Sequence, residues 1–94
     1  MTGAGAAAAT QVIAAPTSGR IFIDSIVYSN DSTNNVSLDD SDGNTVIPTL
    51  YLGVRSGFAL DNFEGYCERN TSLRVTVSAG NWSLLVKYQI DSGV

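Results

Sequence analysis

A run of acidic and amide residues, DDSDGN at positions 39–44, is the stretch of the chain that most resembles a metal site. Asp40, Asp42 and Asn44 alternate in the way that the first ligands of an EF-hand calcium loop do. That loop needs glycine at its sixth position and a bidentate glutamate at its twelfth, where this chain has Thr45 and Tyr51. Because Asp-Gly is a strong turn signal, the run predicts a solvated hairpin turn and no metal site.

The other side chains capable of chemistry form no catalytic pattern. The chain has no histidine, which excludes a Ser-His-Asp triad and leaves Cys67 without an activating base. Asp61, Glu64 and Glu68 are close in sequence, but no pattern sets two of them across a cleft, as glycoside hydrolysis requires. We therefore expect Cys67 to be a core residue, and we expect no catalytic residue, no cofactor and no enzymatic activity, with a small hydrolase as the weakest alternative.

The aromatic residues would form a sugar-stacking surface if they were exposed. They are Trp82 and the tyrosines at positions 28, 51, 66 and 88. Trp82 and Tyr88 share the apolar face of one predicted strand, which favours the core for both, while the positions of Tyr51 and Tyr66 stay open. A carbohydrate-binding module is therefore an alternative function.

Composition bounds the classes of partner. The 94 residues fit one domain, and they are 44% hydrophobic but only 15% charged, with a net charge of −4. The five basic residues form no cluster, which disfavours nucleic-acid binding. No apolar run is long enough to predict a membrane span, the first residues lack a signal-peptide pattern, and a single cysteine suits a reducing compartment.

The elements that must position these residues are strands and turns. Residues 73–77 and 82–90 alternate apolar and polar side chains with a period of two, which predicts two half-buried strands. The SAGN segment between them predicts a hairpin. The expected buried face of this hairpin consists of Leu73, Val75, Val77, Leu84, Val86 and Ile90.

Shorter strands complete the pattern, at 36–38, 58–60 and 65–68. Residues 45–52 predict a further strand that lies at an edge or carries a bulge, because Pro48 cannot donate to a ladder. Seven or eight short strands separated by turns indicate an all-β fold, a single antiparallel β-sandwich that is jelly-roll-like.

The segment RIFIDSIVYS predicts a long strand with two apolar faces. Under strict alternation, Phe22, Ile26 and Tyr28 share one face, and Ile21, Ile23 and Val27 share the other. One sandwich core covers one face of a strand, so the face of Phe22 needs a second cover. We predict that a neighbouring subunit of a homotrimer supplies it, with the chain's own loops as the competing explanation.

The first ten residues, MTGAGAAAAT, have no large side chain after Met1. Fixing ten residues costs on the order of 10–20 kcal/mol, and small side chains bury too little apolar surface to offset that cost. We therefore predict an extended N-terminal arm, residues 1–13, that lies along a neighbouring chain. The β-sandwich domain would comprise residues 14–94.

The stretch APTSGRIFIDSIVYSNDSTNNVSLDDSDGN resembles the start of a diffuse group of small β-sandwich virion proteins of tailed bacteriophages. In that group a Pro/Gly lead-in precedes a long strand and an Asn-centred loop, as residues 16–19, 20–29 and Asn30 do here. The group closes with a Ser-Leu strand, a small turn and a strand that ends in an aromatic residue, matched here by Ser72-Leu73, residues 79–81 and Tyr88. The resemblance covers about residues 12–91 and is a pattern without fixed motif residues.

The resemblance implies a virion structural protein, most specifically a capsid decoration (cement) protein that stabilises the head by bridging capsomers. A tail- or fibre-associated module that binds a receptor or carbohydrate is the alternative. Expected partners are the major capsid protein or other virion proteins, without nucleic acid or membrane, in a virion assembled in the host cytoplasm. The expected interface residues are Thr2, Ala4, Ala6, Ala9, Thr10, Val12, Phe22, Ile26 and Tyr28.

Overall fold

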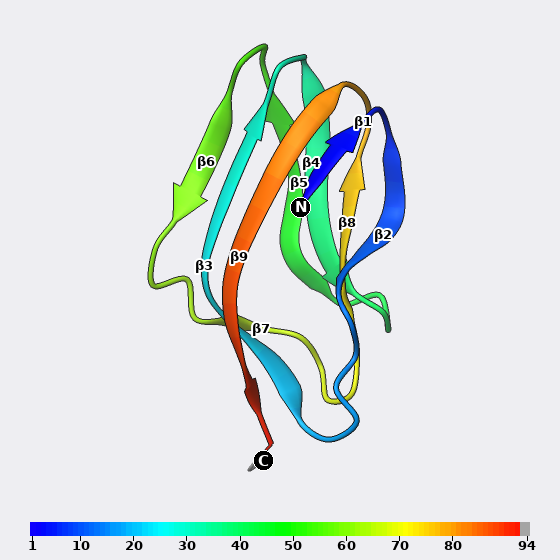
Figure 1. Ribbon diagram of the computed structural model, residues 1–94, viewed down its shortest axis with the longest axis vertical. Helices are drawn as coiled ribbons and strands as arrows, with labels where there is room; N and C mark the ends of the chain where they lie inside the picture. The colour runs from blue at the N-terminus through cyan, green and yellow to red at the C-terminus, as the bar shows by residue number, and fades with distance from the viewer. Residues whose placement is uncertain (93–94) are drawn as a thin grey trace.

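The computed structural model describes residues 1–92, and Gly93 and Val94 of the expected domain lie outside the described part. The described chain is all-β and sandwich-like, with two antiparallel sheets that overlap in Figure 1. Its strands are β1 (Thr2–Ala4), β2 (Ala7–Ile13), β3 (Arg20–Asn30), β4 (Asn34–Asp40), β5 (Thr45–Leu52), β6 (Gly57–Leu60), β7 (Gly65–Tyr66), β8 (Leu73–Val77) and β9 (Asn81–Asp91). The predicted all-β fold with two antiparallel sheets is confirmed.

Each sheet is named here by its two central strands. The β3–β9 sheet has the order β1-β9-β3-β6, and β7 pairs with β3 as well. The β4–β8 sheet has the order β2-β8-β4-β5. The buried apolar side chains of both sheets form one core between them.

The strand pairs are nested around a single turn. β4 pairs with β5 across residues 41–44, β3 pairs with β6 and β7, β2 pairs with β8, and β1 pairs with β9. The strands on either side of this turn therefore pair as in one long antiparallel hairpin. In addition, β3 pairs with β9 and β4 pairs with β8, and these pairs complete the two sheets.

The predicted N-terminal arm is not confirmed, because β1 and β2 form edge strands of the chain's own two sheets. The backbone N–H of Leu84 donates to the carbonyl of Met1 at 2.7 Å, and the indole N–H of Trp82 donates to the carbonyl of Gly5 at 3.2 Å. A Cβ on Gly3 would lie 2.4 Å from the indole ring of Trp82. The small residues of this segment therefore allow close approach within the molecule.

The predicted hairpin of residues 73–90 is wrong in its pairing. β8 lies between β2 and β4, whereas β9 lies between β1 and β3, so the intervening SAGN segment passes from one sheet to the other. The predicted burial is confirmed for Leu73, Val75, Val77 and Leu84. Val86 is half-buried, and Ile90 is 45% exposed because the end of β9 runs past the ends of β4 and β8 (Figure 1).

The hairpin predicted around Asp42 and Gly43 is confirmed as the β4–β5 pair. Val36 pairs with Leu50 and Leu38 with Ile47, so β5 contains an extra residue next to Pro48. β5 is also the last strand of its sheet. Both expectations for Pro48, an edge strand and a bulge, are met.

A bulge in β3 decides which side chains of the long strand are buried. From Ile23 to Ser25, β3 advances by two residues while β9 advances by one, so Asp24 is an extra residue. An extra residue exchanges the two faces of a strand. The residues of β3 that enter the core are therefore Ile21, Ile23, Ile26 and Tyr28. The grouping of Phe22 with Ile26 and Tyr28 expected from strict alternation is therefore wrong, because Ile26 and Tyr28 enter the core whereas Phe22 is only half-buried.

Candidate interaction surface

The nine residues expected to form an interface do not form one surface. Those of the N-terminal segment lie on two edge strands and their link: Thr2, Ala4, Ala6, Ala9, Thr10 and Val12. Ile26 and Tyr28 are corrected to core residues, with Ile26 fully buried. Phe22 is half-buried on the opposite side of β3, so the premise of a subunit covering these three residues together fails.

The outer face of the β3–β9 sheet carries an exposed apolar row. Val27 of β3 lies opposite Leu85 of β9 on one side and opposite Ala59 of β6 on the other. Directly paired residues project to the same face of a sheet. Val27 is 46% exposed and Leu85 is 68% exposed, and we call these three residues the Val27 row.

Small uncharged residues flank the Val27 row towards the end of the sheet where β1 lies. Across β6, β3, β9 and β1 they are Gly57, Ser29, Ser83 and Thr2. On the other side of the row, Ser25 pairs with Lys87, and Phe22 pairs with both Tyr66 and Gln89. The part of the face around Val27 is therefore apolar and free of bulky or charged neighbours on one side.

Aromatic rings mark the opposite end of the same face. The ring centroids of Phe22 and Tyr66 lie 6.3 Å apart, and the guanidinium carbon of Arg20 lies 4.9 Å from the centroid of Tyr66. Such a cation–π contact contributes about 0.5–1 kcal/mol at an exposed site. A shallow hollow beside these rings is lined by Phe22, Gln89, Ile90 and Asp91.

The aromatic residues do not form a common platform for sugar. Trp82 is buried, as predicted, but Tyr88 is exposed, which corrects its expected place in the core. Tyr51 is exposed on β5 and Tyr66 on β7, and these strands belong to different sheets.

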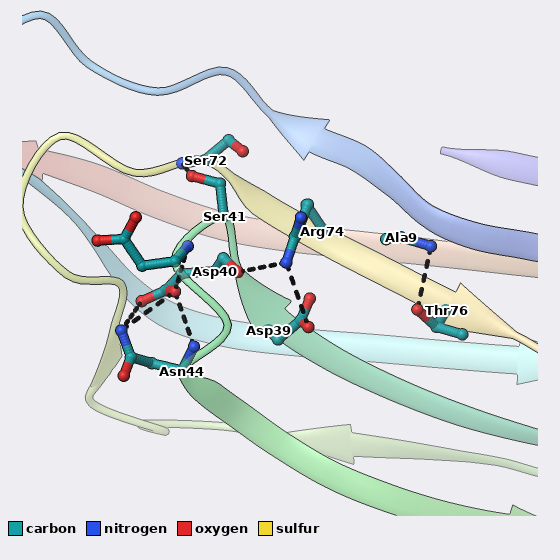
Figure 2. A network of polar contacts seen from close by, with 9 residues as sticks. Ala9, Asp39, Asp40, Ser41, Asn44, Ser72, Arg74 and Thr76 are labelled. Carbon is teal, nitrogen blue, oxygen red and sulfur yellow. Dashed lines mark hydrogen bonds and ion pairs between the residues drawn. The ribbon is translucent and has the colours of Figure 1, made fainter.

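Within the acidic run, Asp40 is buried rather than solvated. Figure 2 shows the polar contacts around its carboxylate. Its Oδ1 accepts from the backbone N–H groups of Asp42 at 2.9 Å and Asn44 at 3.0 Å. Its Oδ2 accepts from the backbone N–H of Glu68 at 3.0 Å and from Nδ2 of Asn44 at 3.1 Å. Burial opposes ionisation, but these donors outweigh it and hold the pKa of Asp40 below its ordinary value. The carboxylate of Asp40 therefore connects the β4–β5 turn to the segment that precedes β8 through hydrogen bonds.

Arg74 supports the same region from β8. One guanidinium nitrogen donates to the backbone carbonyl of Asp40 at 2.8 Å and lies 3.4 Å from a carboxylate oxygen of Asp39 (Figure 2). Both side chains of the Arg74–Asp39 pair are partly exposed, so the pair contributes little by itself. The acidic run is organised by hydrogen bonds inside the protein.

The remaining reactive groups are separated or inert. Cys67 is buried, as predicted, and burial together with the carboxylates of Asp40 and Asp39 raises the pKa of its thiol to about 11. A thiol that stays protonated at neutral pH is a poor nucleophile. The other acids considered for hydrolysis, Asp61, Glu64 and Glu68, are exposed on the segments that flank β7.

Residues 1–92 contain no group of three or more His, Cys, Asp or Glu side chains that could hold a metal ion. They also contain no helix that could span a membrane.

The chain matches no protein-family model, and comparisons with curated proteins and with solved structures give no significant match. The outer face of the β3–β9 sheet, with its exposed apolar residues, is therefore the main evidence on which a function can be proposed.

Proposed function

We propose that the protein is a structural component of a tailed-bacteriophage virion, most specifically a capsid decoration protein. The Val27 row carries this proposal, because apolar side chains gathered on an exposed sheet face mark a site of protein association. The resemblance of residues 12–91 to small virion β-sandwich proteins suggests the kind of assembly. The neighbours would be the major capsid protein or other virion proteins.

The strand order gives further support at the level of the fold. The sheet orders β1-β9-β3-β6 and β2-β8-β4-β5 support our proposal that the fold is a jelly roll with β7 as an added strand. Jelly rolls occur in viral capsid proteins and in lectins. This support is an analogy of fold, which is compatible with either kind of binding and specifies neither.

The mechanism we propose is passive. A protein that binds an assembled shell, and not its separated subunits, adds its binding free energy to the stability of the shell. The decoration protein would therefore raise the temperature at which heads disrupt. No bond is made or broken in this activity.

A tail- or fibre-associated carbohydrate-binding module is the second candidate. The observation in its favour is the group formed by Arg20, Phe22 and Tyr66 beside the hollow that Gln89 and Asp91 line. Aromatic rings, a guanidinium and an amide are groups that bind sugar rings and hydroxyls. Its binding would be abolished by Tyr66→Ala and unaffected by changes in the Val27 row.

Co-sedimentation with decoration-free phage heads tests the proposed function. The wild-type protein should pellet with heads and raise their disruption temperature, and Leu85→Asp should reduce the pelleted amount at least about tenfold. Thr49→Asp, an exposed position of β5 in the other sheet, is the matched control and should pellet normally. Wild-type protein that stays in the supernatant would exclude the decoration role.

A further inference from the structure

We propose that the partner of the Val27 row is a second copy of this chain, docked face to face about a two-fold axis that runs along β3. The inference rests on the proposed function for the role of the row as an assembly surface, and it names the occupant of that surface in the free protein, which a virion neighbour replaces on attachment. An interface of this kind uses the same patch on both copies, so the patch must be complementary to itself.

The Val27 row meets that requirement in side-chain size. β3 has β9 on one side and β6 on the other, and neighbouring strands are about 4.8 Å apart. A half-turn about an axis parallel to β3 carries β9 of one copy over β6 of the other. Leu85 then lies over Ala59 of the second copy, and Val27 meets its own equivalent, so the largest residue of the row faces the smallest.

The adjacent row allows the two sheets to approach. The same rotation puts Ser83 over Gly57 of the second copy and brings Ser29 towards its equivalent. Sheets packed face to face lie about 10 Å apart, which small side chains at the contact permit. Hydroxyl groups in this row can exchange hydrogen bonds across the axis.

Charge complementarity selects a second copy as the occupant. Lys87 is exposed on β9, one level below the Val27 row, where it pairs with Ser25. Asp61 is exposed and directly follows β6, on the opposite side of β3. Neither Lys87 nor Asp61 forms an ion pair within residues 1–92. The two-fold rotation brings the cation of each copy towards the anion of the other, on both sides of the axis.

The size of the face predicts a weak dimer. The rotation superposes three strands, β9, β3 and β6. Three strands about 4.8 Å apart and four rows about 6.7 Å apart cover on the order of 400 Å² per copy. The total of about 800 Å² is below the size of stable specific interfaces and fits a transient dimer. The dimer should therefore dissociate on dilution, and the rim charges should fix its register more than they set its affinity.

Analytical ultracentrifugation of the purified protein without heads tests the inference. The wild type should pass from monomer to dimer as concentration rises, and Leu85→Asp should weaken dimerisation at least about tenfold while circular dichroism stays unchanged. Thr49→Asp should dimerise as the wild type does. Lys87→Glu and Asp61→Lys should each weaken the dimer, and the double variant should restore it, because the swap returns opposite charges to the same positions.

Three results would overturn the inference: a wild type that is monomeric at every concentration, a trimer, or a charge swap without rescue. These outcomes are independent of the test with phage heads. A monomer that pellets with heads contradicts the inference and leaves the proposed function intact. A protein that dimerises but does not pellet with heads supports the inference and contradicts the proposed decoration role.

Discussion

At the scale of single residues, the acidic run of residues 39–44 contains carboxylates with very different roles. Asp40 is buried and accepts hydrogen bonds on both oxygens, Asp39 pairs with Arg74, and Asp42 is exposed. The sequence predicted the turn, because Asp-Gly is a local signal. It could not predict the burial of Asp40, because one of the donors belongs to Glu68, 28 residues further along the chain.

Replacing Asp40 with alanine should destabilise the protein. The backbone N–H groups of Asp42, Asn44 and Glu68 lose their charged acceptor, and a hydrogen bond to a charged group contributes about 1.5–3 kcal/mol. We expect urea unfolding to show a loss of about 2 kcal/mol or more. Asp42→Ala is the matched control in the same turn and should change the unfolding free energy by less than about 0.5 kcal/mol.

The stability of the protein should decrease in acid because the Asp40 carboxylate becomes protonated. The pKa of Asp40 is lowered in the folded state, so its contribution is fully present above the unfolded value of about 3.9 and is lost as the pH falls through the folded pKa. The difference in unfolding free energy between the wild type and Asp40→Ala should therefore be constant near neutral pH and shrink below about pH 4. A difference that persists unchanged in acid would mean that the charge of Asp40 does not contribute.

At the scale of elements, β3 shows what hydrophobic alternation can and cannot predict. The buried residues of this strand change phase, from odd positions at Ile21 and Ile23 to even positions at Ile26 and Tyr28. That change around Asp24 marks the bulge, but it could not be read from the sequence, because Phe22 and Val27 are apolar as well. Strict alternation instead placed Phe22, Ile26 and Tyr28 on one face, and the burial of Ile26 and Tyr28 contradicts that grouping.

For strands β8 and β9, the sequence predicted which side chains are buried but not which strands pair. Alternation predicted the burial of Leu73, Val75, Val77 and Leu84, because a side chain's direction depends on local geometry. Which strands pair with each other depends on the whole sheet. A short turn can connect two strands of different sheets as well as the two strands of a hairpin. The outer Val27 row was missed for the same reason, since its three residues come from strands that are distant in sequence.

Two neighbouring substitutions in β3 should have opposite effects on folding. Ile26→Asp puts an unpaired charge into the core, where the residue is fully buried, and it should unfold the protein. Val27→Asp puts the same charge on the outer face and should leave the near-ultraviolet circular dichroism and the urea midpoint nearly unchanged. A folded, monomeric Ile26→Asp variant would instead support an interface at Ile26, as strict alternation predicts, and would contradict the bulge at Asp24.

At the scale of the whole molecule, the nested pairing explains why a segment of small residues is ordered. β1 pairs with β9 across about 80 residues and β2 pairs with β8, so the first strands cover edges that would otherwise stay open. The other edges are also poor templates for strand addition, since β5 contains Pro48 and a bulge, and β6 and β7 are separate short strands. With the edges blunted in this way, the outer face of the β3–β9 sheet is the surface through which we propose that this molecule associates.

Removal of residues 1–10 distinguishes an edge made of the chain's own strands from an arm held by a neighbour. The deletion takes away β1 and most of β2, including the buried Ala7, and it exposes the ring of Trp82 that Gly3 and the carbonyl of Gly5 contact. We expect the melting temperature of the free protein to fall by at least about 10 °C, since about 4–8 °C corresponds to 1 kcal/mol in a domain of this size. The fluorescence of Trp82, the single tryptophan of the chain, should shift to longer wavelength. Ala8→Ser, an exposed change in the same segment, should do neither. A truncated protein that melts as the wild type does, but no longer sediments with phage heads, would show instead that the segment acts as an arm.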